Sequence, residues 1–331
     1  MITENFYSNL SIWIEGLIQQ KRSIGYKYIS ESSTLKRFDD FYLSHYPNEF
    51  ELTQDIVLNW SKIRTGEHPK TLKIRVAVVR ELAKYMIRNG SKAFILPLGM
   101  TPKIPKYIPY IYSNEELRAI FTAAEQCYYN IQVPYRHYVM PLFFRLLYSC
   151  GLRVSEARLL KLEDVDLENG ILTLKETKAD RHRQVPISFS LRERFVSYFK
   201  CVHLFSSQTD YFFPGFKGKP MSVGNIEANL RRFLWQAGIS HTGRAKPGKQ
   251  GPPTVHSFRH TFAVHCLRKW IREGKNINAY MPVLQAYMGH SSYSDTAYYL
   301  HLTTDLFPDI TTTFIKELGD IIPSVELFKP E

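Results

Sequence analysis

The proline-rich segment ILPLGMTPKIPKYIPYIYS constrains the fold of this chain more than any other stretch. It holds four prolines and shows no helical repeat of apolar residues. Proline removes a backbone donor and fixes φ, so neither a helix interior nor a central strand can run through it. We predict an extended linker at residues 95–112, in which Lys103 and Lys106 can lie along a polyanion. A second domain is expected to begin at Ser113, which forms a capping-box pattern with Glu116.

The region before the linker, residues 1–94, is predicted to be all helical. Apolar residues recur there at the i, i+3, i+4 spacing of one helix face. Two stretches show this repeat, namely Leu10, Trp13, Ile14, Leu17 and Ile18, then Leu35, Phe38, Phe41 and Tyr42. A further helix is expected to begin near Pro69, a favourable first-turn residue, and to end at the C-cap pair Asn89 and Gly90.

This further helix has an apolar face and a basic face. The basic residues are Lys73, Arg75, Arg80, Lys84 and Arg88, with Glu81 as the one acid of the stretch. Such a face is often merely solvated, or it can contact phosphates. Because a solvated surface helix normally mixes both signs of charge, we favour phosphate contacts. We predict DNA-binding roles for Lys73, Arg75, Arg80 and Lys84.

Residues 113–303 are predicted to be mainly helical with one β insertion. Residues 170–177 and 184–188 have strand patterns on either side of a polar turn. The apolar stretch 139–150 predicts a buried helix. The expected fold class is therefore mainly α with a small β-sheet.

Two further segments are rich in interaction signals. The Gly/Pro-rich loop 241–254 carries Arg244, Lys246 and Lys249 without apolar anchors, and we predict that it contacts an anion. The tail 304–331 has a narrow apolar stripe on a short predicted helix, formed by Leu306, Ile310, Phe314 and Leu318.

The overall charge favours a polyanionic partner. The formal net charge is +12, and each Lys or Arg that neutralises a DNA phosphate releases a condensed counterion. The four cysteines lie far apart without a CxxC pair, which indicates reduced thiols. We see no signal-peptide pattern and no apolar run long enough for a bilayer. We therefore expect no membrane association and a cytoplasmic, nucleoid-associated protein.

Four segments carry residue types that make chemical sense together. They are GLRVSE at 151–156, TKADRHRQVPI at 177–187, HSFRHT at 256–261 and GHSSYSDTAYY at 289–299. Each is ambiguous alone. An arginine can simply pair with a glutamate one turn away. A lysine in a hairpin turn is usually solvated, and a lone histidine is more often structural than functional.

In combination, the four segments resemble the tyrosine recombinase (phage integrase) family over residues 113–299. The family has an Arg in a GLRxSE helix start, a Lys in a β-hairpin, an HxxR box, and a GH pair whose His lies nine residues before a Tyr, as here. The resemblance implies a helical N-terminal core-binding domain that clamps DNA and an α+β catalytic domain. It also implies these catalytic residues: Arg153, Lys178, His256, Arg259, His290 and the nucleophile Tyr299, with Glu156 either as a supporting acid or as a local partner of Arg153.

The chemistry of these residue types fits attack on a phosphodiester. Guanidinium groups match phosphate geometry and stay charged, so Arg153 and Arg259 can neutralise the developing charge. His256 and His290 can add hydrogen-bond donors or move a proton. We expect the electropositive pocket to favour the phenolate of Tyr299. No HExxH motif, cysteine cluster or dense carboxylate set is present, so we expect no metal and no other cofactor.

The resemblance further implies a 3′-phosphotyrosyl intermediate, no need for ATP, and a homotetramer on paired double-stranded DNA sites. Lys178 resembles the general acid of the family. The tail helix either docks on a neighbouring protomer or folds back on its own domain. Two other functions stay open, a DNA-binding regulator without catalysis and a type IB topoisomerase. Integration, excision, inversion, dimer resolution and the transposition of a mobile element are not distinguished, nor are accessory DNA-bending or directionality proteins.

Overall fold

The computed structural model describes residues 5–102, 108–175, 182–241 and 250–303. The chain divides into two compact units, Met1–Lys106 and Tyr107–Glu331. The expected fold class is confirmed, because helices dominate the described residues and a single three-stranded sheet accompanies them. None of the helices in the described residues combines the length and the apolar character that a bilayer crossing requires.

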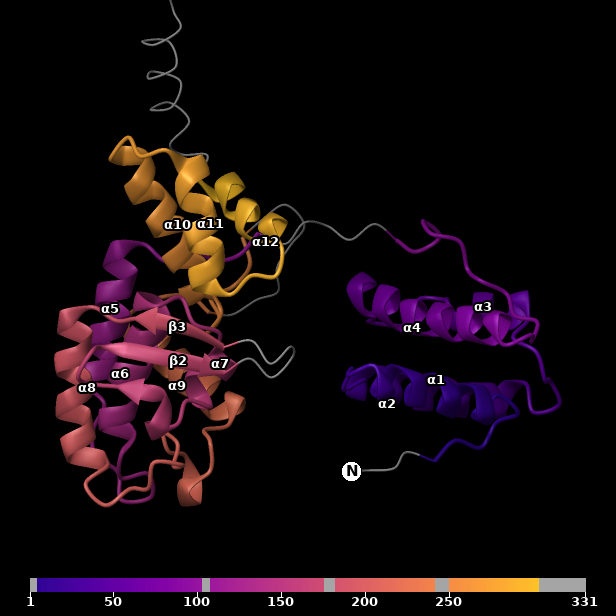
Figure 1. The fold of residues 1–331 in the computed structure, drawn as a ribbon, viewed down its shortest axis with the longest axis horizontal. Helices are drawn as coiled ribbons and strands as arrows, with labels where there is room; N and C mark the ends of the chain where they lie inside the picture. Colours follow the sequence, from indigo (N-terminus) through magenta and orange to yellow (C-terminus); the bar gives the residue numbers. More distant parts are fainter. Residues whose placement is uncertain (1–4, 103–107, 176–181, 242–249, 304–331) are drawn as a thin grey trace, which may run out of the picture. The chain divides into compact units, whose positions relative to one another are not determined.

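The first unit is helical, as its apolar spacing predicts. Its helices are α1 (Ser11–Ser23), α2 (Ile29–His45), α3 (Gln54–Trp60) and α4 (Pro69–Arg88). In Figure 1, α4 runs alongside the α1–α2 pair, and it contacts both. Leu17, Phe38 and Met86 are completely buried between these helices. Leu96, in the predicted linker, is also buried in this core.

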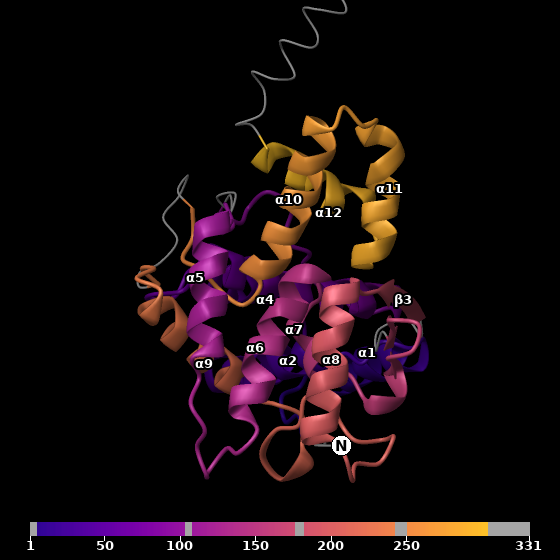
Figure 2. The ribbon, with the colours of Figure 1, turned by 90° about the vertical axis from the view of Figure 1, so that its left-hand side faces the viewer.

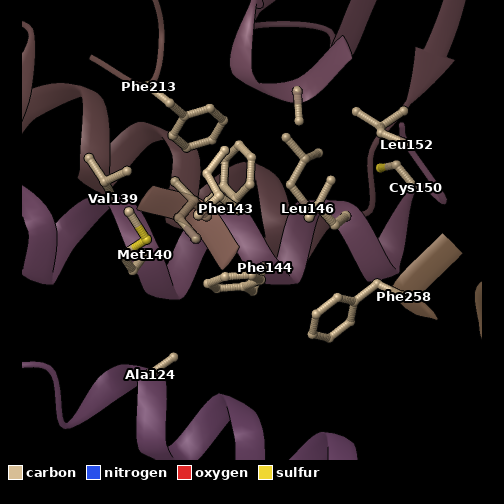
Figure 3. Close-up of a cluster of buried hydrophobic side chains, with 14 of the residues drawn as sticks. Ala124, Val139, Met140, Phe143, Phe144, Leu146, Cys150, Leu152, Phe213 and Phe258 are labelled. Carbon is tan, nitrogen blue, oxygen red and sulfur yellow. The ribbon is translucent and has the colours of Figure 1, made fainter. Parts of the chain in front are cut away.

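The second unit packs four long helices around an aromatic core. These are α5 (Asn114–Glu125), α6 (Arg136–Ser149), α8 (Phe189–Val202) and α9 (Val223–Gln236). Figure 3 shows Phe143, Phe144 and Phe213 in this core, and Phe258 joins it from the first turn of α10. The predicted capping box at the start of α5 is confirmed, with Ser113 and Glu116 each bonding the other's backbone N–H.

The β insertion is an antiparallel sheet in the order β1 (Val165–Asp166), β2 (Ile171–Lys175) and β3 (His182–Pro186). Thr173 faces Gln184 in the β2–β3 register. The described return strand begins at His182, two residues before the predicted start at Gln184. The short helices α7 (Val154–Arg158) and η1 (Leu162–Asp164) precede the sheet, and η2 (Phe216–Gly218) lies between α8 and α9.

The last described segments form a smaller group at one end of the second unit, seen in Figures 1 and 2. They are α10 (Ser257–Arg272), α11 (Ile277–Met288), α12 (Tyr293–Ala297) and η3 (Tyr298–Leu302). Val264, Leu267 and Leu284 give this group its own apolar core, which also contains Tyr299. The backbone of Tyr112, at the end of the predicted linker, donates to Thr261 Oγ1 on α10 at 3.0 Å.

Candidate functional site

Glu156 lies at the centre of a cationic cluster at the start of α7. Its carboxylate accepts hydrogen bonds from the backbone N–H and from Nη1 of Arg153, both at 2.8 Å. Arg183, on β3, donates a hydrogen bond to each carboxylate oxygen at 3.0 Å, which makes a bidentate pair. Burial alone would raise the pKa of Glu156, but the hydrogen bonds and charge of Arg183 outweigh it and lower that pKa. The carboxylate therefore stays ionised and ties the sheet to the start of α7.

Arg259 and Arg153 both bind backbone carbonyls at the C-terminal end of α11. Arg259 is 2% exposed and donates to Gly151 O and Met288 O, both at 2.7 Å. Arg153 donates to the next carbonyl, Gly289 O, at 2.8 Å. Burial, together with the charge of Arg153, lowers the pKa of Arg259 to about 10, so it remains cationic at neutral pH. The structure thus brings two guanidinium groups from distant motifs into one pocket.

Gly289 shapes this turn. It ends α11 in the left-handed region at φ +66°, where glycine is favoured because it has no Cβ. A Cβ at this position would lie 2.6 Å from Arg183 Nη1. The backbone therefore passes close to the arginine, and His290 follows directly. His290 Nδ1 lies 2.7 Å from Thr296 Oγ1 on α12, which orients the imidazole ring.

The phenol of Tyr299 faces this pocket from η3. Tyr299 is 3% exposed, and its ring stacks on that of His290 with 6.1 Å between centroids. Its hydroxyl lies 3.1 Å from Nδ1 of His260 on α10. Burial raises the pKa of Tyr299 although the Arg259 guanidinium opposes it. Arg259 and Arg153 thus favour the phenolate as expected, but desolvation outweighs them, and Lys178, the remaining cation of the expected pocket, lies outside the described residues.

Three imidazoles share the pocket and are neutral at pH 7. Burial, with the charges of Arg259 and Arg153, lowers the pKa of His256 to about 4 and of His290 to about 4. His256 is nevertheless exposed to solvent at the mouth of the cluster, where it contacts the His260 ring. Burial and the neighbouring His256 lower the pKa of His260 to about 3. Neutral imidazoles can donate through one nitrogen and accept through the other.

Six of the seven predicted catalytic residues converge in the structure. They are Arg153, Glu156, His256, Arg259, His290 and Tyr299. Lys178 lies outside the described residues. Sequence reasoning missed Arg183 and His260. Their signals were present, since Arg183 precedes the VPI return strand and His260 directly follows Arg259, but neither has a meaning before its neighbours are known.

Comparison with known proteins agrees with this geometry. Residues 111–305 match the phage integrase family. The chain belongs to this family of tyrosine recombinases. A putative integrase/recombinase (y4rB) of Sinorhizobium fredii is 29% identical over 89% of this chain and 94% of its own length. Tyrosine recombinase XerD of Vibrio vulnificus is 25% identical over 91% of both chains.

Solved structures of tyrosine recombinases share the fold. The XerH site-specific recombinase bound to its palindromic difH substrate has a TM-score of 0.66 at 20% identity, covering 92% of this chain and 84% of XerH. A lambda integrase (75–356) dimer on a COC′ core site has a TM-score of 0.62 at 19% identity, covering 87% of this chain and 94% of the integrase. These solved structures therefore share the fold of this chain, and its sequence relatives are named as an integrase/recombinase and a tyrosine recombinase.

The predicted DNA contacts on α4 need one correction for this integrase-family chain. Arg75 is 5% exposed and pairs with Glu67, with Nε at 2.7 Å from Oε1 and Nη2 at 2.9 Å from Oε2. It also donates to the Trp60 and Lys62 carbonyls and lies over the Trp60 ring. Its position at the edge of the apolar face points it into the domain. The prediction that Arg75 binds DNA is therefore wrong.

The other predicted DNA-binding residues differ in their surroundings. Lys73 is exposed, Lys84 is exposed and pairs with Glu81 at 2.9 Å, and Arg80 Nε donates to Leu96 O at 2.9 Å. The remaining predicted DNA-binding residues lie outside the described residues; they are Lys103, Lys106, Arg244, Lys246 and Lys249. The apolar stripe of the tail also lies outside them. Within the described residues, no three His, Cys, Asp or Glu side chains gather as metal ligands would.

Proposed function

We propose that this protein cuts and rejoins DNA as a site-specific recombinase, with Tyr299 as the nucleophile. One observation carries the proposal. The Tyr299 hydroxyl, 3.1 Å from an imidazole nitrogen, lies in the pocket where Arg153 and Arg259 bind successive carbonyls of residues 288 and 289. A phosphodiester seated there meets a nucleophile and two cations at once.

The two arginines would bind the non-bridging oxygens of the scissile phosphate. Their guanidinium groups are already held by backbone carbonyls and by Glu156, so little reorganisation is needed when charge builds up on phosphorus. His256 and His290, neutral at pH 7, can each donate one N–H to the same oxygens. This arrangement stabilises the transition state by fixed electrostatics.

The covalent step forms a bond between Tyr299 Oη and phosphorus and breaks the bond to the 5′ oxygen of the DNA. The product is a 3′-phosphotyrosyl ester, whose bond energy lets a second 5′-hydroxyl attack without ATP. The leaving oxygen needs a proton, and we assign Lys178 as its donor. General acid catalysis is typically worth about 10²–10⁴-fold in rate.

Double-stranded DNA is the proposed partner, and the solved relatives include integrases bound to DNA. We propose that the first unit clamps the duplex and that a homotetramer works on two sites in the cytoplasm. One solved relative is the integrase of the Tn1549 transposon in complex with a circular intermediate DNA, which suits a role in moving a genetic element.

A covalent-capture experiment tests the proposal and finds the recognition sequence at the same time. Sheared DNA from the source genome is incubated with the protein, denatured in detergent, and selected for fragments bound covalently to protein. We expect enriched sequences with wild type and none with Tyr299→Phe. If the wild-type protein binds DNA but forms no covalent product with it, the protein is a DNA-binding regulator and the proposed recombinase function is wrong.

The captured sequence then supplies a nicked suicide duplex. Cleavage traps the adduct on this duplex because the short 5′ fragment diffuses away. Strand exchange between two such sites supports recombination. Relaxation of any supercoiled plasmid, with no site preference, would instead identify a type IB topoisomerase.

A further inference from the structure

The histidine that touches the nucleophile is not one that the HxxR and GH motifs point to. Among the described residues, His260 has the one imidazole nitrogen within hydrogen-bond distance of the Tyr299 hydroxyl, at 3.1 Å. His290 engages Thr296 Oγ1 through its own Nδ1. His256 contacts the His260 ring, with centroids 4.5 Å apart, and no hydrogen bond joins it to Tyr299 within the described part of the chain.

The position of His260 is set by groups on both sides. Its neighbour Arg259 is anchored by two carbonyls, and Phe258 is completely buried in the aromatic core. The following residue, Thr261, is also completely buried and accepts from the Tyr112 backbone. The ring of His256, one helical turn earlier, packs edge-on against His260 at an interplanar angle of 89°. The imidazole is therefore held facing the phenol.

We propose that His260 is the general base that removes the proton from Tyr299, an inference that rests on the proposed recombinase function. As Tyr299 Oη attacks phosphorus, its O–H bond breaks and the proton moves to His260 Nδ1. The Oη–P bond forms, the P–O5′ bond breaks, and the 5′ oxygen takes a proton from Lys178. Resealing reverses each step, with His260 returning the proton to Tyr299. The assignment requires the neutral tautomer that carries its proton on Nε2.

The charges around His260 make this base depend on the DNA. Burial makes the largest contribution to the lowered pKa of His260, which is about 3. The facing groups His256, Arg259 and His290 lower this pKa further. The free protein therefore keeps an unprotonated Nδ1 beside a protonated phenol. A phosphodiester adds negative charge next to Arg259, so protonation of His260 becomes easier when DNA is bound. Proton transfer to His260 is then favoured in the DNA-bound state.

Single-turnover cleavage of the suicide duplex tests the role of His260. Asparagine can keep a hydrogen bond to the phenol, but it cannot accept the proton. We expect His260→Asn to form the adduct about 10²–10⁴-fold more slowly at unchanged DNA affinity. Circular dichroism and thermal melting establish that the variant is folded. In His260→Ala, added imidazole is expected to restore at least about tenfold of the lost rate, since it supplies the missing base.

A matched control comes from the same helix. His265 is also partly buried, and its Nδ1 lies 3.0 Å from the Tyr148 hydroxyl, away from the nucleophile. We expect His265→Asn to form the adduct at the wild-type rate. A duplex with sulfur in place of the bridging 5′ oxygen separates base from acid, because a thiolate leaves without a proton. It should rescue Lys178→Ala but leave His260→Asn slow.

The outcomes separate the two proposals. Active wild type with His260→Asn near the wild-type rate would overturn this inference alone. So would a slow His260→Ala that imidazole does not accelerate, or a His260→Asn that the sulfur-containing duplex rescues. If wild type itself forms no adduct, the proposed function fails and the role of His260 fails with it.

Discussion

Arg153 and Arg259 have the same chemistry but different structural roles. Arg259 is 2% exposed and uses its two terminal nitrogens to bridge Gly151 O and Met288 O. The side chain of Arg153 is 36% exposed and pairs with the neighbouring Glu156. Arg259 therefore links two distant backbone segments of the pocket, whereas Arg153 adds a partly exposed cation to it.

Replacing each arginine by lysine should reveal this difference. A lysine ammonium is a compact charge without the planar fork whose two nitrogens reach Gly151 O and Met288 O, so we expect Arg259→Lys to leave one buried acceptor unpaired. We expect it to lower the free energy of unfolding by about 1–3 kcal/mol. Arg153→Lys should change it by less than about 1 kcal/mol, because its ion pair is partly exposed. Both variants should lose adduct formation. Urea denaturation measures the free energy of unfolding. Equal losses of unfolding free energy in the two variants would contradict the different structural roles of Arg153 and Arg259.

At the scale of single elements, the C-terminus of α11 couples the sheet to the catalytic turn. Gly289 has φ +66°, and a Cβ there would lie 2.6 Å from Arg183 Nη1. Gly274, after α10, has a similar φ of +65°, yet a Cβ there meets nothing within 4 Å. The two glycines share a backbone requirement but differ in their surroundings.

Alanine at these two positions separates backbone strain from steric clash. Gly274→Ala should cost only the left-handed backbone term, about 1 kcal/mol, and leave cleavage unchanged. Gly289→Ala should cost more, about 2–4 kcal/mol, because Arg183 must also move away from Glu156. We expect its cleavage rate to fall as well. Thermal melts and adduct assays on both variants check this, and identical behaviour would refute the coupling.

Helix α4 offers a similar comparison between a buried and an exposed cation. Arg75→Met leaves the Glu67 carboxylate buried without its partner, and we expect a loss of about 3–5 kcal/mol in unfolding free energy. Lys73→Met should leave stability unchanged. If Lys73 contacts a phosphate, the slope of log affinity against log salt should weaken by about 0.9. Titrations at several salt concentrations measure this slope, and an unchanged slope would remove Lys73 from the interface.

At the scale of the whole molecule, the pocket histidines make stability depend on acidity. The pKa values of His256, His260 and His290 are about 4, 3 and 4 in the folded chain. An unfolded histidine titrates near 6.5, so the unfolded chain binds more protons between pH 6.5 and 4. Stability is therefore fully present above pH 6.5 and falls as pH drops through this window.

Each proton that only the unfolded chain binds contributes about 1.4 kcal/mol per pH unit to that loss. We expect the melting temperature to fall steadily from pH 7 to pH 4.5, and His260→Asn to make the fall shallower. The lowered pKa of Glu156 acts only at more acidic pH, below its ordinary value of 4.5. A melting temperature that is flat over this range would contradict the lowered pKa values of these imidazoles.

Much of the local structure follows from short-range sequence patterns. The apolar repeat predicts the buried faces of α1 and α2, and the Ser113–Glu116 pair predicts the start of α5. The β insertion is also predictable, because alternation and a polar turn act within a few residues. Arg75 shows where such patterns fail. Its place at the edge of a helix face does not reveal that Glu67 and two carbonyls lie on the inner side.

The sequence by itself determined α1, α2, α4, the start of α5, the β2–β3 pair and the set of residue types for phosphodiester chemistry, because these depend on neighbours along the chain. Only the tertiary structure decided which nitrogen meets the phenol and that Arg183 shares Glu156 with Arg153. It also decided that burial raises the pKa of Tyr299 in spite of the nearby guanidinium groups. Contact geometry and desolvation arise from segments far apart in the chain, such as Arg259 and Gly151 at a separation of 108 residues, and spacing alone does not encode them.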